Sequence, residues 1–191
     1  KKNILSFITQ LKLICNFSEQ NKSSKLSTVK SIIKETPNDS KIIIFSQYVT
    51  TLEKIQRSLE DLNYETYMYH GKMKEKQKEE SISGFKNSIE KKSILLISLM
   101  AGGVGLNIPE GTHVILYDRW WNPALESQAI ARAHRIGKKD NLHVFKFVVS
   151  DTIEDYIEEL IKLKEDLIDK VDEKIDDISK EITKELMTYF S

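Results

Sequence analysis

Short apolar runs alternate with amphipathic segments through the middle of this chain. The first run, Lys41–Ser46, has no polar alternation, which is typical of a strand buried on both faces of a parallel sheet. Similar runs follow it, and helical periodicity between them predicts helices that cover the sheet. We expect strands at 41–46, 64–69, 93–98, 112–117 and 142–149, with helices at 49–62, 74–86 and 124–136. This order predicts an α/β fold with a parallel sheet flanked by helices.

The two ends of the chain have helical periodicity without strands. Apolar residues predict one helix over 3–17 and a second that contains Leu26 and Ile33 and ends near Pro37. Residues 151–155 are typical of a capping box, and apolar residues keep a helical rhythm from there to 186. We therefore divide the chain into a helical lead-in (1–40), a sheet domain (41–150) and a C-terminal brace helix with an acidic helical tail (151–191).

The zero formal net charge hides an uneven distribution of charge. Residues 1–150 contain 23 lysines and arginines against 15 acidic residues, whereas residues 151–191 contain 6 against 14. A basic body is weak support for a polyanionic partner, and a solvated lysine-rich surface explains it equally well. The acidic tail could repel DNA, cover the basic body or bind a protein partner, and the sequence leaves these three open.

Cysteine usage and hydropathy indicate an intracellular protein. Cys15 is the only cysteine, so neither an internal disulfide nor a thiolate zinc cluster can form, and the four histidines are not spaced as metal ligands. No apolar run reaches membrane-spanning length, so we expect no metal site and no membrane partner. The expected location is the cytoplasm or nucleoid of a prokaryote, or the nucleus of a eukaryote. Because the chain begins at Lys1, we expect it to be part of a longer polypeptide.

Four loops leave the carboxyl ends of the predicted strands, and in parallel sheets such loops build the functional site. They are rich in Gly, Ser, Asn and Trp, and three of the chain's seven glycines lie at 102, 103 and 105. Glycine lets a backbone approach a phosphate, although a simple tight turn also tolerates it. We expect these loops to share one edge of the sheet, followed by the arginine-bearing helix. The loops span 46–48, 70–73, 98–107 and 118–123.

Arginine is scarce here, with only four among 29 basic residues, yet Arg132 and Arg135 lie three apart. On a helix they share one face, with Gln128 one turn before Arg132. Two planar guanidinium groups suit a multiply charged oxyanion such as a phosphate chain, although a surface helix with ordinary salt bridges is the alternative. No Gly-x-x-x-x-Gly-Lys-Ser/Thr loop is present, so we expect another domain to hold the nucleotide.

Segments 42–48, 98–107, 118–123 and 128–137 closely resemble motifs IV, V, Va and VI of Snf2-family ATPases, which are helicase-like DNA translocases of superfamily 2. The resemblance is to the second RecA-like lobe, the helicase C-terminal domain, which has the P-loop NTPase fold. Leu11–Asn16 and Ser24–Leu26 also resemble family segments, as does the brace helix. The sequence of residues 119–123 most resembles that of prokaryotic Snf2 proteins and of the Rad5/Rad16-like group.

The resemblance implies an ATP-driven motor on double-stranded DNA, with ATP and Mg²⁺ held mainly by the first RecA-like lobe of the same polypeptide. Arg132 and Arg135 match the arginines that reach the γ-phosphate. Three residues match positions near the nucleotide: Gln128, Gly105 and Asn107. Six match positions toward DNA: Ser46, Gln47, Ser98, Gly102, Gly103 and Trp121. For Trp121 a core aromatic that braces the following helix is an equal alternative, and Trp120 is expected in the core.

Four positions depart from the family pattern. Lys138 replaces a glutamine, Met100 a basic residue, Lys74 a serine and Lys78 an arginine. The lysines keep or add positive charge, but the loss of an arginine at 78 puts a two-pronged phosphate contact there in doubt. Among the acidic residues, Asp118 and Glu126 could form an acid/base pair, whereas a cap or a basic partner is the better interpretation of Asp118.

Two other functions remain open at this point. One is a non-catalytic module that binds nucleic acid or protein on the same fold, and the other is a strand-separating helicase of superfamily 2. The motor interpretation requires that Arg132 and Arg135 lie neither in the hydrophobic interior nor on the rim opposite the glycine-rich segment.

Overall fold

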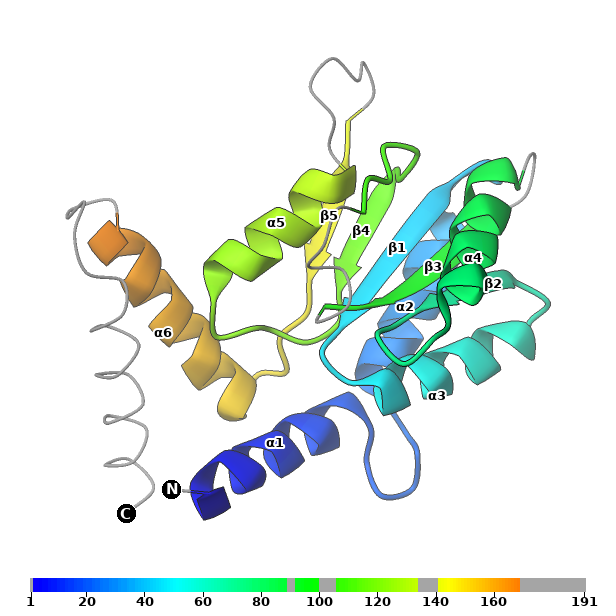
Figure 1. Cartoon of the computed structure of the whole chain (residues 1–191). Helices are drawn as coiled ribbons and strands as arrows, with labels where there is room; N and C mark the ends of the chain where they lie inside the picture. Colours follow the sequence, from blue (N-terminus) through cyan, green and yellow to red (C-terminus); the bar gives the residue numbers. More distant parts are fainter. Residues whose placement is uncertain (1, 89–91, 100–105, 134–140, 169–191) are drawn as a thin grey trace.

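The computed structural model describes residues 2–88, 92–99, 106–133 and 141–168, and within them it forms a parallel sheet between two helical layers (Figure 1). The strand order is β2-β3-β1-β4-β5, and every pairing is parallel. The strands are β1 (Lys41–Ser46), β2 (Glu65–Tyr69), β3 (Ser93–Ser98), β4 (His113–Leu116) and β5 (His143–Lys146). The predicted α/β fold is therefore confirmed, although β5 is shorter than the expected 142–149.

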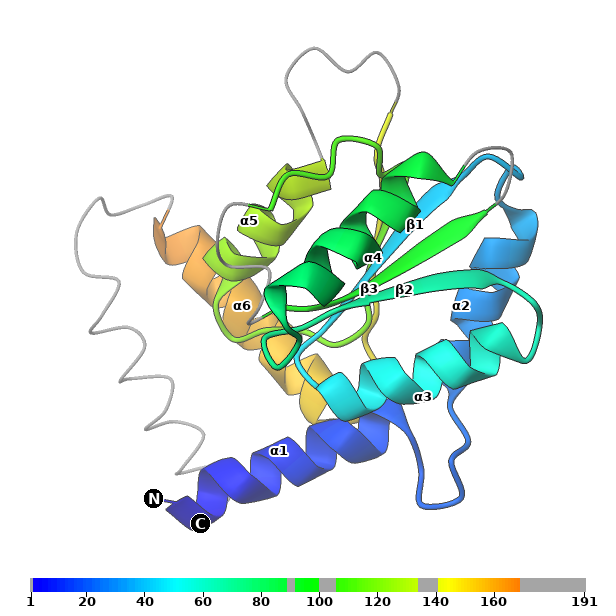
Figure 2. The same ribbon diagram turned by 45° about the vertical axis from the view of Figure 1, so that its right-hand side comes forward.

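Alternate residues of β1 enter two separate cores. Ile42 and Ile44 pack against α2 (Ser24–Glu35) and α3 (Val49–Glu60), whereas Ile43 and Phe45 face α4 (Glu75–Asn87) and α5 (Pro123–Ala133). All four side chains are at most 1% exposed. Burial of both faces explains the unbroken apolar run in the sequence. Figure 2 shows α4 crossing the face of the sheet opposite to α2 and α3.

Two further helices lie outside these layers. Helix α1 (Lys2–Asn16) runs beneath the carboxyl ends of the strands, and α6 (Ile153–Ile168) packs against it (Figures 1 and 2). Ile8 of α1 joins Ile153, Ile157 and Ile161 of α6 in a small third core. The lead-in and the brace therefore contact each other, and the boundaries at 40 and 150 stay a prediction.

The start of α6 follows the predicted acidic cap. Thr152 Oγ1 accepts the backbone N–H of Glu154 at 3.1 Å, and the Asp155 carboxylate accepts the N–H of Asp151. These bonds satisfy donors that a helix start leaves unpaired, with acidic side chains near the positive end of the helix dipole. Residues 169–191, which include the acidic tail, lie outside the described residues.

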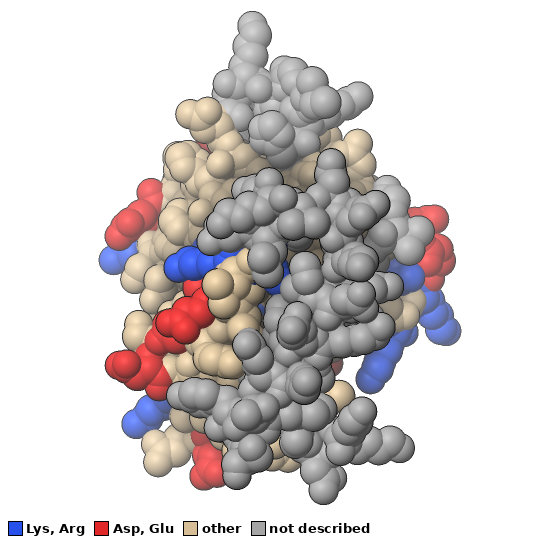
Figure 3. Space-filling view, turned by 90° about the vertical axis from the view of Figure 1, so that its left-hand side faces the viewer, with Lys and Arg blue, Asp and Glu red and all other residues tan. Residues whose placement is uncertain are grey.

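The charged surface seen in Figure 3 is mixed. Lysine, arginine and acidic side chains are interspersed among the coloured residues of that face, without a broad area of one sign. The described part of the chain has no helix long and apolar enough to span a membrane.

Candidate functional site

Asp118 organises the loops at the carboxyl ends of β1 and β4. Its side chain is fully buried and accepts the Ser46 hydroxyl, the backbone N–H of Gln47 at 3.0 Å and the Asn16 amide at 3.1 Å. A carboxylate with three donors is satisfied as an anion. Asp118 thus ties α1 to two loops. Its hydrogen-bond partners in the described part of the chain are an amide, a hydroxyl and a loop N–H, so it acts as a loop-bridging acceptor and not as the predicted helix cap or partner of a basic residue.

The predicted DNA residues at this edge differ in exposure. Ser46 and Ser98 are buried, and the Ser46 hydroxyl is engaged with Asp118. Gln47 and Trp121 are half-buried and belong to neighbouring loops, since Gln47 Nε2 donates to the carbonyl oxygen of Arg119. The structure therefore brings Ser46, Gln47 and Trp121 together, with the two half-buried side chains nearer to solvent.

Trp121 also packs against the third core formed by α1 and α6, and its carbonyl accepts a 3.4 Å bond from Lys164 of α6. Trp120 packs against the core beneath α4 and α5, as predicted. The alternative interpretation of Trp121 as a packing residue therefore has support, and its contact with DNA stays a prediction.

Arg119 is a structural arginine. It is 1% exposed and donates from Nε and Nη2 to the two carboxylate oxygens of Glu126 at 3.0 and 3.1 Å, and its Nη1 pairs with Glu158 of α6. This two-pronged geometry explains an arginine in a lysine-biased chain. It also excludes Glu126 from the acid/base pair considered from the sequence, because the carboxylate is 1% exposed and paired.

Two lysines at this edge were not assigned a role from the sequence. Lys25 of α2 contacts the Asn16 amide oxygen at 3.0 Å, the Tyr117 carbonyl at 2.9 Å and Glu154 of α6 at 2.5 Å. Lys12 of α1 donates to the Arg119 carbonyl at 2.6 Å. The family-like segments around Lys12 and Lys25 were the only signal for them. Burial raises the pKa of Glu154, with Lys25 opposing that shift.

The predicted nucleotide residues lie elsewhere, along α5. Gln128 is exposed and Arg132, one turn later, is half-buried. Arg132 Nη1 donates to the Leu106 carbonyl at 3.0 Å, and the Arg132 carbonyl accepts the Ile108 N–H at 2.9 Å. Asn107, between these two contacts, is exposed and its carbonyl accepts a bond from Lys86. Arg132, Asn107 and the end of the glycine-rich segment are therefore neighbours.

Helix α5 begins at the carboxyl edge of the sheet, as expected, but it runs back beside the sheet. Its last residue, Ala133, lies 3.2 Å from the position that a Cβ on Gly111 would occupy, and Gly111 precedes the amino end of β4. Arg132 is thus separated from Ser46 and Gln47 by the length of the helix. The predicted site therefore has two parts. All four loops leave the carboxyl edge of the sheet, as expected, because every strand pairing is parallel, whereas Arg132 lies at the far end of α5.

Four predicted site residues lie outside the described residues: Arg135, Gly102, Gly103 and Gly105. The same holds for Met100 and Lys138, two of the departures from the family pattern. Lys74 and Lys78 are described, and Lys78 pairs with Glu75 at 3.0 Å.

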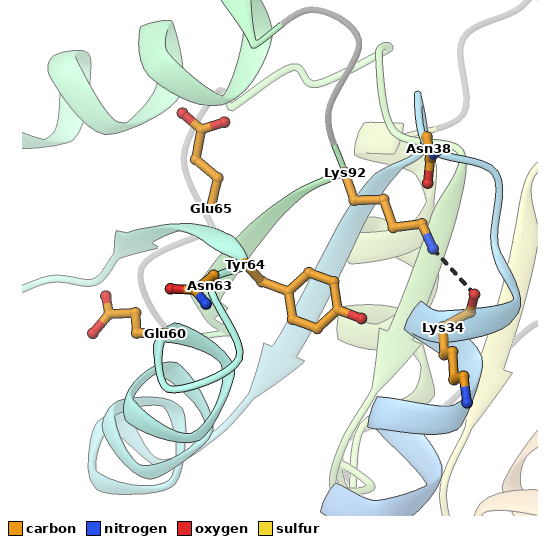
Figure 4. A pocket seen from close by; sticks show the side chains of 7 residues that line it. All are labelled: Lys34, Asn38, Glu60, Asn63, Tyr64, Glu65 and Lys92. Atoms are coloured by element: carbon orange, nitrogen blue, oxygen red, sulfur yellow. Dashed lines mark hydrogen bonds between the residues drawn. The ribbon is translucent and has the colours of Figure 1, made fainter.

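A cavity lies away from both parts of the site, at the amino ends of β2 and β3. It has a volume of about 680 Å³, and Tyr64 lies between the ends of α2 and α3 in it (Figure 4). Lys92 at its wall donates to the carbonyls of Ile33 and Lys34. Its mixed charges belong to Lys34, Lys92, Glu60 and Glu65, and none of the predicted site residues lines it. Among the described residues, no cluster of three or more His, Cys, Asp and Glu side chains could hold a metal ion.

Comparison with known proteins agrees with this geometry. Residues 24–137 match the helicase conserved C-terminal domain family. The DNA repair protein RAD5B of Arabidopsis thaliana is 40% identical over 147 residues, which are 77% of this chain but 11% of that protein. The chain thus spans about a ninth of that relative.

Two solved structures have similar folds. The Sulfolobus solfataricus SWI2/SNF2 ATPase C-terminal domain has a TM-score of 0.69 and 29% identity, covering 96% of this chain and 78% of that one. The SWI2/SNF2 ATPase core from the same organism in complex with dsDNA has a TM-score of 0.69 and 31% identity, covering 86% and 36%.

The matched domain covers more than half of the chain. The parallel sheet and the similarity to RAD5B and to SWI2/SNF2 proteins support the same family. The chain therefore belongs to the helicase conserved C-terminal domain family, as a C-terminal RecA-like lobe of the Snf2 group in superfamily 2.

Proposed function

We propose that this chain is the second motor lobe of an ATP-dependent translocase on double-stranded DNA. The observation that carries the proposal is the position of Arg132, which lies half-buried on the same helix as the exposed Gln128 and binds the backbone directly after the glycine-rich segment. The chain has no phosphate-binding loop of its own, so a first lobe of the same polypeptide supplies most contacts to ATP and Mg²⁺. This lobe closes on the bound nucleotide.

We assign two arginines and three other residues to the nucleotide side of the lobe. Arg132 and Arg135 neutralise charge on the transferring γ-phosphoryl group, a role worth roughly 10³–10⁵ in rate. Gln128 lies one turn before Arg132 on α5, and Asn107 is held beside the same turn through Leu106 and Ile108. Gly105, which lies outside the described residues, is assigned to the nucleotide by its match to the family motif alone.

The DNA side lies at the carboxyl edge of the sheet. Gln47 and Trp121 are the half-buried side chains there and meet the DNA backbone. Gly102 and Gly103 are assigned to DNA by the resemblance alone, and Ser98, which is buried, supports this edge from within. Ser46 acts indirectly. Its hydroxyl donates to Asp118, and Asp118 accepts the backbone N–H of Gln47. Contacts of this kind bind phosphate and sugar and carry no sequence preference. The SWI2/SNF2 core bound to dsDNA supports this assignment by similarity.

The decisive experiment measures ATP hydrolysis with and without duplex DNA. The isolated chain should hydrolyse no ATP, whereas the parent polypeptide with both lobes should show DNA-stimulated hydrolysis. Arg135→Ala should lower that rate by at least roughly a hundredfold. Arg57→Ala removes an exposed arginine of α3 and is the matched control, with an unchanged rate expected. If Arg135→Ala keeps more than about a tenth of the rate, its assignment to the γ-phosphate is wrong.

The mode of movement needs a separate assay. A duplex translocase should displace the third strand of a triplex in an ATP-dependent reaction while leaving a forked duplex paired. Unwinding of the fork without triplex displacement would identify a strand-separating helicase instead. An absence of ATP hydrolysis in the parent would favour a binding module on the same fold.

A further inference from the structure

Lys12 belongs to α1, outside the sheet, yet its ammonium group lies between the loops that carry Gln47 and Trp121. The side chain is 1% exposed, and Nζ donates to the Arg119 carbonyl oxygen at 2.6 Å. Gln47 Nε2 donates to the same oxygen. One backbone carbonyl therefore joins the first helix of the chain to the loop after β1 and the loop after β4.

Two aromatic rings flank the same ammonium group. Nζ of Lys12 lies 5.9 Å from the centre of the Tyr48 ring and 5.6 Å from the Trp121 ring. A cation near both ring faces is attracted by each of them. Tyr48 follows Gln47 directly in the sequence, so the contact restrains both loops through their aromatic side chains as well as through Arg119.

Stability alone does not account for a lysine at this position. None of the carboxylates in the described part of the chain forms an ion pair with Lys12, although Asp118, Glu154 and Glu126 lie near it, as does the positive charge of Lys25. Burial lowers the pKa of Lys12 to about 8, against the effect of these carboxylates. Burying an ammonium group costs free energy that an apolar side chain of equal length would not. The hydrogen bond to the Arg119 carbonyl and the contacts with the two rings offset part of this cost, and the same contacts restrain the two loops.

We propose that Lys12 is a positioning residue for DNA engagement, whose ammonium group holds Gln47 and Trp121 in the geometry in which they meet the DNA backbone. This rests on the proposed function, which assigns those two residues to DNA. Lys12 is buried and contacts neither DNA nor nucleotide itself. Removing its charge loosens both loops while leaving Arg132 and the nucleotide side intact.

The test uses the parent polypeptide with both lobes. Lys12→Met keeps the length and apolar stem of the side chain. The duplex DNA concentration that gives half-maximal ATP hydrolysis should rise roughly tenfold, as expected for misplaced contacts, while the rate at saturating DNA stays within about twofold. Lys12→Arg keeps the charge and lets a planar guanidinium stack between the rings, so it should restore the wild-type value. Lys22→Met removes an exposed lysine and should have no effect.

Hydrogen exchange of the two loops provides the second readout. In a folded Lys12→Met protein, verified by thermal melting, peptides covering 46–49 and 119–122 should exchange faster than in the wild type. Should Lys12→Met not fold, Lys12→Gln keeps an N–H donor without the charge and carries the same comparison. Unchanged DNA activation, or equal behaviour of Lys12→Met and Lys12→Arg, would overturn the proposal.

Different results would refute the proposed function and the positioning role of Lys12. A wild-type parent without DNA-stimulated ATP hydrolysis would refute the proposed function. Unchanged exchange in both loops after loss of the Lys12 charge would refute the positioning role, whatever the parent does on DNA.

Discussion

The apolar core of the sheet and the polar cluster beneath its carboxyl ends are held together by different interactions. In β1 and β3 the core side chains are at most 1% exposed and come from continuous apolar runs. The polar cluster of Asn16, Lys25, Asp118 and Glu154 is also buried, with each residue no more than 4% exposed. Its members come from segments up to 138 residues apart and meet through directional bonds. Burial of the core stabilises the fold but is not directional. The hydrogen bonds and ion pair of the cluster fix the relative orientation of the segments, at the cost of desolvating charged groups.

This difference shows how the helices outside the sheet are held. Lys25 and Glu154 join α2 to α6, and Asn16 joins α1 to Asp118 at the end of β4. Each of these contacts converges on the edge that carries Gln47 and Trp121. The lead-in and the brace therefore fix the geometry of the proposed DNA side, whereas the two apolar cores support the sheet as a whole.

The largest expected effect comes from breaking a buried ion pair of the cluster. Lys25→Met leaves the Glu154 carboxylate, which is 0% exposed, without its cation and should lower the free energy of unfolding by about 3–5 kcal/mol. Denaturant unfolding of the 191-residue chain measures this. The double variant Lys25→Met with Glu154→Gln removes the charge and keeps an acceptor for the Val149 N–H, so it should recover much of the loss. Equal instability of the single and double variants would contradict an ionic role.

A truncation in the apolar core should lower the free energy of unfolding by a similar amount, but it should leave the loop after β1 unchanged. Ile44→Ala opens a cavity in the core beneath α2 and α3 and should cost about 2–5 kcal/mol. Because Ile44 makes no directional contact to the loops, hydrogen exchange at 46–48 should stay as in the wild type under strongly native conditions. Selective loosening of that loop would remove the distinction between core and cluster.

Neutralising Asp118 should have a smaller and more local effect. Asp118→Asn places an amide donor where three donors point at a carboxylate, and should cost about 1–3 kcal/mol. Exchange of the Gln47 amide should rise, and Asp118→Ala should not restore it. An unperturbed Gln47 amide would show that Asp118 does not hold the loop.

The pH dependence of Lys12 gives the smallest predicted change. Its pKa is lowered by burial from 10.5 to about 8 in the folded chain, so above pH 8 the unfolded state binds more protons and stability rises with pH. The gain between pH 8 and 9 should be roughly 1 kcal/mol, and Lys12→Met should lack it. Affinity of the parent for duplex DNA should fall over the same interval, which a purely structural role would not produce.

The strands and covering helices could be predicted because apolar periodicity is local. The segment Ile42–Phe45 shows its two-sided burial without knowledge of any partner, and β3 does the same. The shortened β5 is the exception, because its residues are largely exposed and its ends depend on pairing with β4 alone. Residues next to predicted turns, such as Asp118, were also placed correctly at a strand end.

The polar cluster could not be predicted, because nothing near Lys12 or Lys25 in the sequence indicates a partner more than 90 residues away. The structural role of Arg119 could not be predicted either, because its partner Glu158 lies on a helix distant in the sequence. The alternation of strands and helices implies that α5 runs back along the sheet, but it does not say which site residues lie at the far end of the helix. Those features arise only when the sheet is assembled.

The most direct test of the account separates ATP binding from ATP hydrolysis in the parent carrying Arg135→Ala. With an arginine that acts on the transferring phosphoryl group, the dissociation constant for ATP should change by less than about threefold, while single-turnover hydrolysis on duplex DNA falls by roughly a thousandfold. Hydrolysis retained at more than about a tenth of the wild-type rate, with ATP binding intact, would contradict the assignment of this lobe as the source of the γ-phosphate arginines.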